Sequence, residues 1–481
     1  MAVTSVRPVG AAAIPPATAR ERLVVAMPAD RVASWLWALA ITALAGVLRF
    51  AGLSSPSEKM FDEVYYSKDA FDLLRHGVEL NGTENGPGFI AHPPMGKWLI
   101  AVGEWAFGYN SFGWRVSAAV IGTLSVLVLV RVARRMTRST VLGCVAGLLM
   151  TFDGLHFVQS RVAMLDIFLM WWILAAFGCL LVDRDAARSR LAAGSAAGLR
   201  PWRLAAAVCL GLALATKWSA VWYVVAFALL AFAWDCGARR SAGAPRPVRA
   251  SLRAGAGWGA VYLVVILGVY TASWTGWFVT SAGYDRHVGA NALVGWLHYH
   301  QEILGFHTHL TTYHRYSSLP WSWLLLGRPV AYFYTTPTGC GARDCSREVL
   351  DIGTPALWWP FAGALVAVTW RWLAHRDWRG AAVLAGVGAG FLPWLPYPHR
   401  TMFLFYALPA LPFLVLATTL ALGMVLGGRS ASADRRLIGA LIVAGYVSLV
   451  GLTFLFFHPV LVGQTLTSVQ WHHRMWLLTW I

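Results

Sequence analysis

Long apolar segments alternate with short polar or Pro/Gly-rich segments along almost the whole chain. An α-helix needs about 20 residues to cross the hydrocarbon core of a bilayer, which is about 30 Å thick. The spacing of the apolar segments therefore predicts about eleven transmembrane helices. Their approximate ranges are 34–53, 111–132, 141–157, 164–182, 204–218, 220–234, 255–278, 353–373, 380–395, 402–426 and 437–457.

Two of these ranges, 204–218 and 220–234, are nearly continuous and could be read as one long helix. Lys217 argues against that reading. A lysine ammonium at the bilayer centre costs about 2.5 to 3.5 kcal/mol even on a lenient insertion scale. A turn that brings Lys217 to the membrane interface avoids this cost, so we predict two helices here. Merging them would invert the topology of every later segment.

The composition agrees with a membrane-embedded chain. Hydrophobic residues make up 58% of the 481 positions and charged residues only 13%, the mean hydropathy is +0.57, and there are 26 Trp residues. Such values exclude an ordinary soluble globular protein. We predict an all-α polytopic membrane protein.

Arginine residues gather in every second loop, which sets the orientation of the chain. By the positive-inside rule these loops are cytoplasmic, so the first span runs from inside to outside. The net charge of +17 reflects this topology, and it does not indicate a nucleic-acid partner because the arginines are scattered among short loops. The basic loops follow the ranges 111–132, 164–182, 220–234, 353–373 and 402–426.

The domain organisation follows from the same topology. Residues 1–33 are rich in Ala, Pro and Arg and lack the apolar core of a signal peptide, so we predict a disordered cytoplasmic tail. Residues 34–481 form one transmembrane domain with two long outer loops, 54–110 and 280–352. Both loops are predicted to carry helices that lie in the outer membrane interface.

Charged residues without an anchoring role concentrate at the outer ends of the predicted spans. The adjacent acids Asp62 and Glu63 stand among aromatic residues just after the first span, where a partly desolvated carboxylate can act as a base. The alternative for this pair is a solvated turn, and for each arginine an interfacial anchor. A transporter would place such charges near the bilayer midplane. The other outer charges are Arg161, Asp166, Lys217 and Arg400.

The second outer loop contains Cys340 and Cys345, which an oxidising compartment would allow to form a small disulfide ring. The same loop is rich in histidine. The histidine spacing fits no compact zinc pattern, so we predict no metal site. The histidines are His298, His300, His307, His309 and His314.

A series of motifs carries a resemblance to a known family. The motifs are Phe61-Asp62-Glu63-Val64-Tyr65-Tyr66, Asp69-Ala70, His92-Pro93-Pro94-Met95-Gly96-Lys97, Trp114-Arg115, Arg161-Val162-Ala163-Met164-Leu165-Asp166, Thr216-Lys217-Trp218 and Arg400-Thr401-Met402-Phe403-Leu404-Phe405-Tyr406-Ala407-Leu408-Pro409. In sequence and in order they resemble the protein O-mannosyltransferases, over nearly the whole chain after the tail. The Cys340–Cys345 loop and the following Trp358-Trp359 resemble the actinobacterial branch, the polyprenyl-phosphate-mannose–protein mannosyltransferases.

The resemblance implies a GT-C type bundle of glycosyltransferase family 39. Such an enzyme transfers mannose from a polyprenyl-phosphate-mannose lipid to Ser or Thr hydroxyls of exported proteins, by inverting single displacement at the outer face of the cytoplasmic membrane. A lipid-phosphate donor needs no nucleotide site, so no cofactor is expected, and a requirement for a divalent metal stays open. Membrane lipids are further expected partners, and acceptor delivery at the secretion translocon is an additional expectation.

The match to the family's motifs assigns roles to individual residues. Asp62 is the expected catalytic base, and Glu63 is expected to orient the sugar or the acceptor peptide. Arg161 has a structural alternative, a pair with Asp166. His92, Lys97 and Asp166 are expected in supporting roles. The expected donor and phosphate contacts are Arg115, Arg161, Lys217 and Arg400, since cationic groups suit an anionic leaving group.

Two alternatives share parts of this pattern. A related enzyme could transfer another lipid-linked sugar, such as an aminoarabinose, to a glycolipid. A carrier or lipid flippase is the non-enzyme alternative. One departure concerns the acceptor: Ala91 stands where many eukaryotic relatives have an acid before the His-Pro-Pro motif, so peptide recognition is expected to differ.

Overall fold

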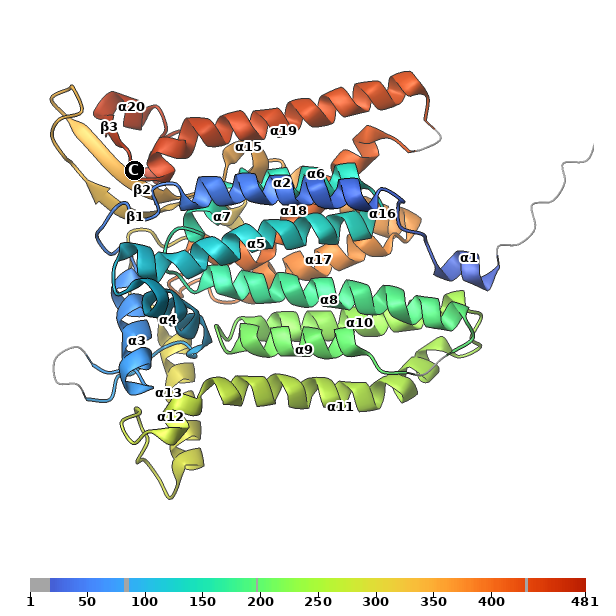
Figure 1. Cartoon of the computed structure of the whole chain (residues 1–481), viewed down its shortest axis with the longest axis horizontal. Helices are drawn as coiled ribbons and strands as arrows, with labels where there is room; N and C mark the ends of the chain where they lie inside the picture. Colours follow the sequence, from blue (N-terminus) through green and yellow to red (C-terminus); the bar gives the residue numbers. More distant parts are fainter. Residues whose placement is uncertain (1–17, 82–85, 196–197, 429–430) are drawn as a thin grey trace, which may run out of the picture.

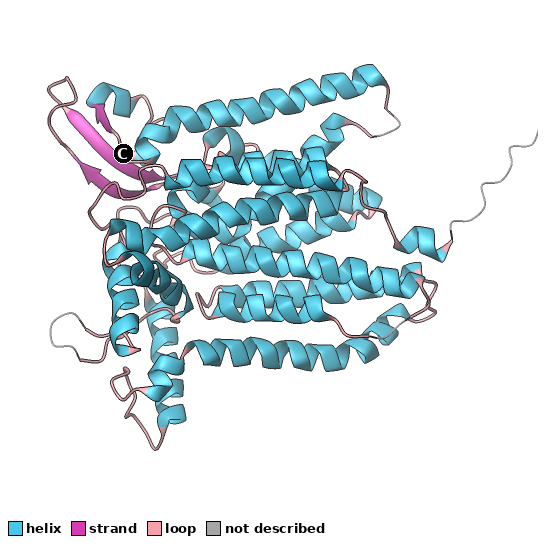
Figure 2. Cartoon of the chain, viewed as in Figure 1, coloured by secondary structure: helices cyan, strands magenta, loops and turns pink. Residues whose placement is uncertain are grey.

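The computed structural model describes residues 18–81, 86–195, 198–428 and 431–481. Long helices lie side by side in one bundle, and short elements gather at one end of it, at the left of Figure 1. Figure 2 shows how small the strand content is beside the helices. The predicted helical fold is confirmed.

Seven helical segments among the described residues are long and apolar enough to cross a membrane. They are α2 (Arg31–Phe50), α5 (Ser111–Thr137), α8 (Asp166–Ala192), α10 (Ala220–Ser241), α11 (Pro247–Ser273), the continuous segment of η2 (Leu404–Ala410) and α18 (Leu411–Leu426), and α19 (Ala433–Leu461). Shorter helices occupy the other predicted ranges. They are α6 (Thr140–Thr151), α9 (Pro201–Leu214), α16 (Phe361–His375) and α17 (Trp378–Phe391).

Breaks between helices place polar residues at the end of the bundle where the short elements gather, which we call the outer end after the predicted orientation. Helix α9 ends at Leu214 and α10 begins at Ala220, so the predicted turn at Lys217 is present. The predicted span 141–157 is shorter than expected, because α6 ends at Thr151 and the chain restarts as α7 (Gly154–Gln159). The carboxylate of Asp153 causes this restart by accepting a hydrogen bond from the backbone N–H of His156 at 2.8 Å, which caps α7.

Helix α8 lies at the centre of the bundle. It packs against α5, α9, α10 and η2. In its most apolar stretch of 18 residues, 67% of the residues are buried, compared with 6% in the corresponding stretch of helix α11 at the periphery. Asp166 begins α8, so a largely buried helix delivers a carboxylate to the outer end of the bundle.

Helices from both long loops gather at one end of the bundle, as Figure 1 shows for α3, α4 and α13. Helix α3 (Glu63–His76) follows Asp62 directly, as the spacing of apolar residues predicts, and ends at Gly77, whose φ of +76° suits glycine. Helix α4 (Met95–Phe107) follows the His-Pro-Pro motif. The remaining outer elements are α12 (Thr275–Val279), α13 (Ala292–His309), α14 (Pro320–Trp323), α15 (Pro355–Trp358), η1 (Leu392–Trp394), α20 (Ser468–His472) and η3 (Leu478–Trp480).

A small antiparallel sheet, which the sequence reading did not anticipate, completes the outer end. Its strands are β1 (Val330–Thr335), β2 (Cys345–Asp351) and β3 (Thr465–Thr467), in the order β1-β2-β3. A disulfide joins Cys340 and Cys345, whose Cα atoms are 5.9 Å apart, in the connection between β1 and β2. The second outer loop thus combines an interfacial helix with a disulfide-linked hairpin.

The predicted tail, residues 1–33, falls partly outside the described residues, since 1–17 are not among them. Within the described part, α1 (Ala19–Leu23) is a short helix and α2 already begins at Arg31. The carbonyl of Leu23 accepts a hydrogen bond from Arg188 of α8 at 2.8 Å. The described part of the tail therefore docks against the bundle.

Candidate active site

A cavity of about 190 Å³ opens at the outer end of the bundle, where α8 begins and α9 gives way to α10. Aromatic side chains form much of its wall, including Trp218, Trp222, Tyr223 and Trp394. Its polar lining comes from five separate parts of the sequence and includes His92, Asp166, Lys217, His307, Arg400 and Tyr406.

An ion pair between Lys217 and Asp166 is the most enclosed charged feature of this cavity. The Lys217 Nζ lies 2.7 Å from Asp166 Oδ2, and both side chains are nearly buried. Asp166 stands in the first turn of α8, where the helix dipole favours a carboxylate. The ammonium also lies 5.8 Å from the ring centre of Phe405 and 5.4 Å from that of Tyr406. A positive group is thereby held against aromatic rings in the cavity wall.

Asp62 stands beside this pair, at the start of α3. Burial raises the pKa of its carboxyl to about 6; the nearby Lys217 ammonium lowers that pKa and the Asp166 carboxylate raises it. A hydrogen bond with Tyr66 also lowers it. A carboxylate with a pKa near 6 is ionised at neutral pH and is a better proton acceptor than an ordinary aspartate.

The backbone just before Asp62 is held by aromatic packing. Phe61 has a φ of +46°, an unusual conformation for a residue with a bulky side chain. Its ring stacks on Tyr332 of β1 at 4.9 Å, and the rings of Phe403, Phe405 and His314 meet it edge-on at 5.7 to 5.9 Å. Packing from three segments thus compensates the strained backbone and fixes where Asp62 points.

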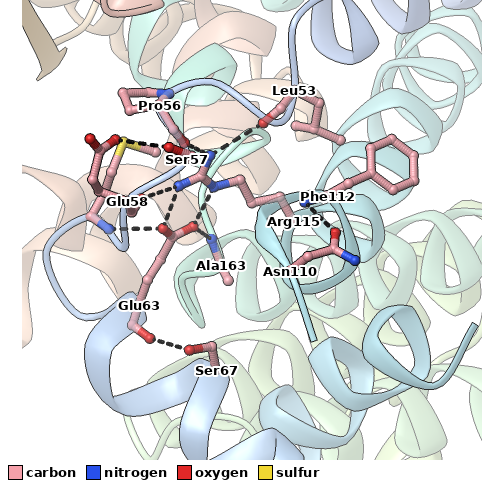
Figure 3. Close-up of polar contacts among 11 residues, drawn as sticks. Leu53, Pro56, Ser57, Glu58, Glu63, Ser67, Asn110, Phe112, Arg115 and Ala163 are labelled. Atoms are coloured by element: carbon pink, nitrogen blue, oxygen red, sulfur yellow. Dashed lines mark hydrogen bonds and ion pairs between the residues drawn. The ribbon is translucent and has the colours of Figure 1, made fainter. Parts of the chain in front are cut away.

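Glu63 and Arg115 bind each other away from the cavity. Figure 3 shows the two side chains pointing toward one another, with paired bonds of 2.8 Å from Arg115 Nε and Nη2 to the two carboxylate oxygens. Backbone N–H groups of Met60 and Ala163 donate to the same carboxylate at 2.9 Å. Both side chains are 0% exposed.

The rest of the Arg115 guanidinium is also occupied. It donates to the carbonyls of Leu53, Pro56 and Glu58 at 2.5 to 3.3 Å, as Figure 3 shows. No polar atom of this pair is left to contact a sugar or a phosphate. These bonds do not fit the donor contact expected for Arg115 or the substrate contact expected for Glu63. We assign both residues a positioning role instead, in which they hold the loop that carries Asp62.

Arg161 also differs from the expectation. Its guanidinium donates to the carbonyls of Leu48, Arg49, Ala51 and Gly52 at 2.7 to 3.3 Å, so it caps the C-terminal end of α2. It forms no pair with Asp166, whose partner is Lys217. The expected phosphate contact of Arg161 is replaced by this capping role.

Lys97 is buried between two acids of the first outer loop, Glu79 at 2.8 Å and Asp69 at 3.2 Å. This cluster ties α4 to α3 and to the turn that follows α3. The supporting role expected for Lys97 is therefore a structural one, because its ammonium is already neutralised by two carboxylates.

A second cationic group, Arg400, reaches the cavity together with two histidines. Arg400 Nε donates to the carbonyl of His307 at 3.0 Å. The ring of His307 stacks on that of His92 at 5.1 Å, and its Nε2–H donates to the carbonyl of Ala91 at 2.6 Å. Burial lowers the pKa of His307 to about 4 and that of His92 well below its usual value, so both rings are neutral. The cationic groups of the cavity lining are thus Lys217 and Arg400.

The family model of dolichyl-phosphate-mannose-protein mannosyltransferases matches residues 39–242, and that of the C-terminal four-transmembrane region of protein O-mannosyltransferases matches residues 292–480. This chain belongs to the protein O-mannosyltransferase family.

Individual members of this mannosyltransferase family match the chain over nearly its full length. The polyprenol-phosphate-mannose–protein mannosyltransferase of Mycolicibacterium smegmatis is 40% identical, with 94% of each chain covered. That of Mycobacterium tuberculosis is 41% identical, with 94% of this chain and 93% of the relative covered. The fold matches the Saccharomyces cerevisiae protein O-mannosyltransferase Pmt1-Pmt2 complex bound to the sugar donor, with a TM-score of 0.74, 14% identity, and coverage of 94% and 93%. The predicted family and GT-C fold are confirmed.

The sequence analysis assigned no role to three residues in or beside the cavity. They are His307, Tyr66 and Tyr406. A signal for His307 existed in the seven-residue spacing between His300 and His307, which places both on one face of α13, toward Trp218. Tyr66 follows Asp62 by one helical turn and hydrogen-bonds with it. Tyr406 lies within a family motif that the sequence analysis quoted without assigning its tyrosine.

A different cluster of polar groups lies outside the cavity lining. Asp285, His298 and Glu302 bring ligand-type atoms within 4.8 Å of one another. Hydrogen bonds already use these atoms, since His298 Nδ1 lies 2.8 Å from Asp285 and the Tyr284 hydroxyl donates to Glu302 at 2.9 Å. The sequence spacing did not predict this cluster, and we assign no ion to it.

Proposed function

We propose that this mannosyltransferase family member transfers mannose from a polyprenyl-phosphate-mannose lipid to Ser or Thr hydroxyls of exported proteins. The relatives in the two mycobacterial species carry the name of that donor and of a protein acceptor. The observation that carries the proposal is the Lys217–Asp166 ion pair in the wall of an aromatic cavity, with the Asp62 carboxyl close enough to interact electrostatically with both charges.

The reaction is a single displacement at the anomeric carbon. Asp62 accepts the proton of the acceptor hydroxyl as its oxygen forms a bond to that carbon. The bond between the carbon and the phosphate oxygen breaks, and its electron pair leaves with the polyprenyl phosphate. Attack from the face opposite the leaving group inverts the configuration of the sugar carbon.

The departing phosphate gains negative charge, which the cavity is built to stabilise. Lys217 and Arg400 supply the positive charge, and aromatic walls exclude water and so strengthen their interaction with the phosphate. Asp166 neutralises Lys217 in the absence of substrate and keeps its ammonium oriented toward the cavity. A reaction that proceeds through these residues requires no nucleotide.

The proposed location is the outer face of the cytoplasmic membrane, with the N-terminus inside. Supporting this, the ends of α5, α8 and α10 opposite the cavity carry the arginine-rich loops. Exported polypeptides emerge on that side, so the acceptor is expected to arrive as an unfolded chain, and delivery by the secretion translocon would supply it in that state.

The proposal is tested by supplying membranes that contain the protein with a Ser/Thr-rich peptide and one lipid donor at a time. Polyprenyl-phosphate mannose should label the peptide, and polyprenyl-phosphate glucose or arabinose should label it far more slowly. Preferential use of another sugar, or transfer to a glycolipid in place of the peptide, would contradict the proposed donor and acceptor.

A further inference from the structure

A second hollow of about 330 Å³ adjoins the catalytic cavity on the outer side of the protein. Its walls are the segment 311–319 and the turn 398–401, and we refer to it as the 311–319 groove. Arg400 lines both the groove and the catalytic cavity. The two spaces therefore meet at a residue that the proposed mechanism assigns to the donor phosphate.

The groove lining is polar and almost uncharged. Apart from Arg400 and His399, its polar side chains are hydroxyls, and Tyr313 presents an aromatic ring that is 85% exposed. Such a lining offers hydrogen bonds to backbone amides and hydroxyls, and an exposed tyrosine is a common anchor at protein interfaces. It offers little to a polyprenyl tail, which needs apolar walls. The hydroxyl residues are Thr311, Thr312, Ser317, Ser318 and Thr401.

Backbone hydrogen bonds hold the two walls of the groove together. The Thr401 N–H donates to the carbonyl of Leu310 at 3.0 Å, and the Ser318 N–H donates to the carbonyl of Met402 at 2.8 Å. The Thr401 hydroxyl also donates to the carbonyl of Thr312. The groove thus exists before any ligand binds, which lowers the entropic cost of binding.

The segment that forms one wall of the groove also contacts the loop that carries the base. His314 belongs to this segment but does not line the groove, and its ring meets the ring of Phe61, the residue before Asp62, at 5.8 Å. The groove is thus linked to the Asp62 loop through one wall segment and to the catalytic cavity through Arg400.

We propose that the 311–319 groove binds the acceptor polypeptide in an extended conformation and delivers its Ser or Thr hydroxyl toward Asp62. This inference rests on the proposed function and adds the route of the acceptor. The donor then occupies the cavity beside Lys217, and the two substrates meet between Asp62 and Arg400. An unfolded Ser/Thr-rich segment suits the groove because its backbone groups are free to bond with the hydroxyl lining.

The test fills the groove and measures both substrates separately. In Thr311→Trp a bulky ring replaces an exposed groove residue, and Thr465→Trp makes the same change at an exposed position of β3 as the matched control. Tyr313→Ala removes the exposed ring without adding volume. Initial rates of mannose transfer are measured against peptide concentration at saturating lipid, and against lipid concentration at saturating peptide.

Thr311→Trp is expected to raise the KM for peptide about tenfold, equivalent to the loss of one good contact, with the KM for the lipid donor unchanged. Tyr313→Ala should raise the peptide KM in the same direction, and Thr465→Trp should match wild type. Equal peptide KM values in all four proteins would overturn the groove assignment. A wild-type protein that fails to mannosylate any peptide would instead refute the proposed function, so the two failures are distinguishable.

Discussion

Breaking the Glu63–Arg115 pair should destabilise the fold rather than only slow the chemistry. In Glu63→Gln, the neutral amide faces the buried Arg115 guanidinium and the N–H groups of Met60 and Ala163. One end of the amide is a donor and accepts none of these bonds. Arg115 keeps its charge in a site with 0% exposure.

The magnitude follows from the burial. Removing one partner of a buried ion pair costs about 3 to 5 kcal/mol, because the remaining charge is left uncompensated. The double variant Glu63→Gln/Arg115→Met removes the charge as well, but the carbonyls of Leu53, Pro56 and Glu58 then lose their donor. Each carbonyl left buried without a donor costs about 1 to 3 kcal/mol, so the new loss offsets the gain from removing the charge and the double variant should be no more stable than Glu63→Gln.

The assay is denaturant-induced unfolding of the purified protein in mixed micelles, together with the transfer rate per folded molecule. The control is Arg135→Gln, which opens a partly exposed pair with Asp185 and should cost about 0 to 1 kcal/mol. A Glu63→Gln protein with wild-type stability and a lost transfer rate would refute the positioning role. It would return Glu63 to direct contact with substrate.

Three further predictions concern the catalytic residues. Asp62 acts as an ionised base with a pKa of about 6, so in a rate–pH profile kcat/KM should fall as the pH drops through that value and level off above about pH 7. A flat profile would argue against this base. Lys217→Gln should lower kcat by about 10² to 10³. The variant should also move the acidic limb of the rate–pH profile to higher pH, because the ammonium that lowers the Asp62 pKa is gone. An unmoved limb would contradict the electrostatic interaction between Lys217 and Asp62. Phe61→Ala should lower kcat about tenfold with both KM values nearly unchanged in steady-state kinetics, whereas a rise in KM alone would show that Phe61 does not position the base.

The sequence was sufficient to predict the helices because each span buries its own backbone hydrogen bonds and needs only length and apolarity. The turn at Lys217 followed from the cost of one buried charge. The sheet did not, because its strands are short and β3 lies more than a hundred residues after β2 in the chain. A strand of three residues whose partner lies far away in the chain, as β3 is, leaves little signal in a sequence.

The candidate site was predictable as a set of residues but not as a set of pairs. Charge placement gathered Asp62, Arg161, Lys217 and Arg400 at the outer end of the bundle, and the match to the family's motifs added Arg115. Tertiary distances decide whether a cation faces a cavity or a neighbouring carboxylate. In this structure they pair Arg115 with Glu63. The same distances placed Arg161 on the end of α2.

The central claim, that Asp62 is the base of a mannosyl transfer, is tested most directly by Asp62→Asn. Membranes with equal amounts of wild-type and variant protein would receive labelled polyprenyl-phosphate mannose and a Ser/Thr-rich peptide. The account predicts that peptide labelling falls by about 10² to 10⁴, the usual contribution of a positioned base, while unfolding stability is unchanged. Wild-type labelling by Asp62→Asn would contradict it.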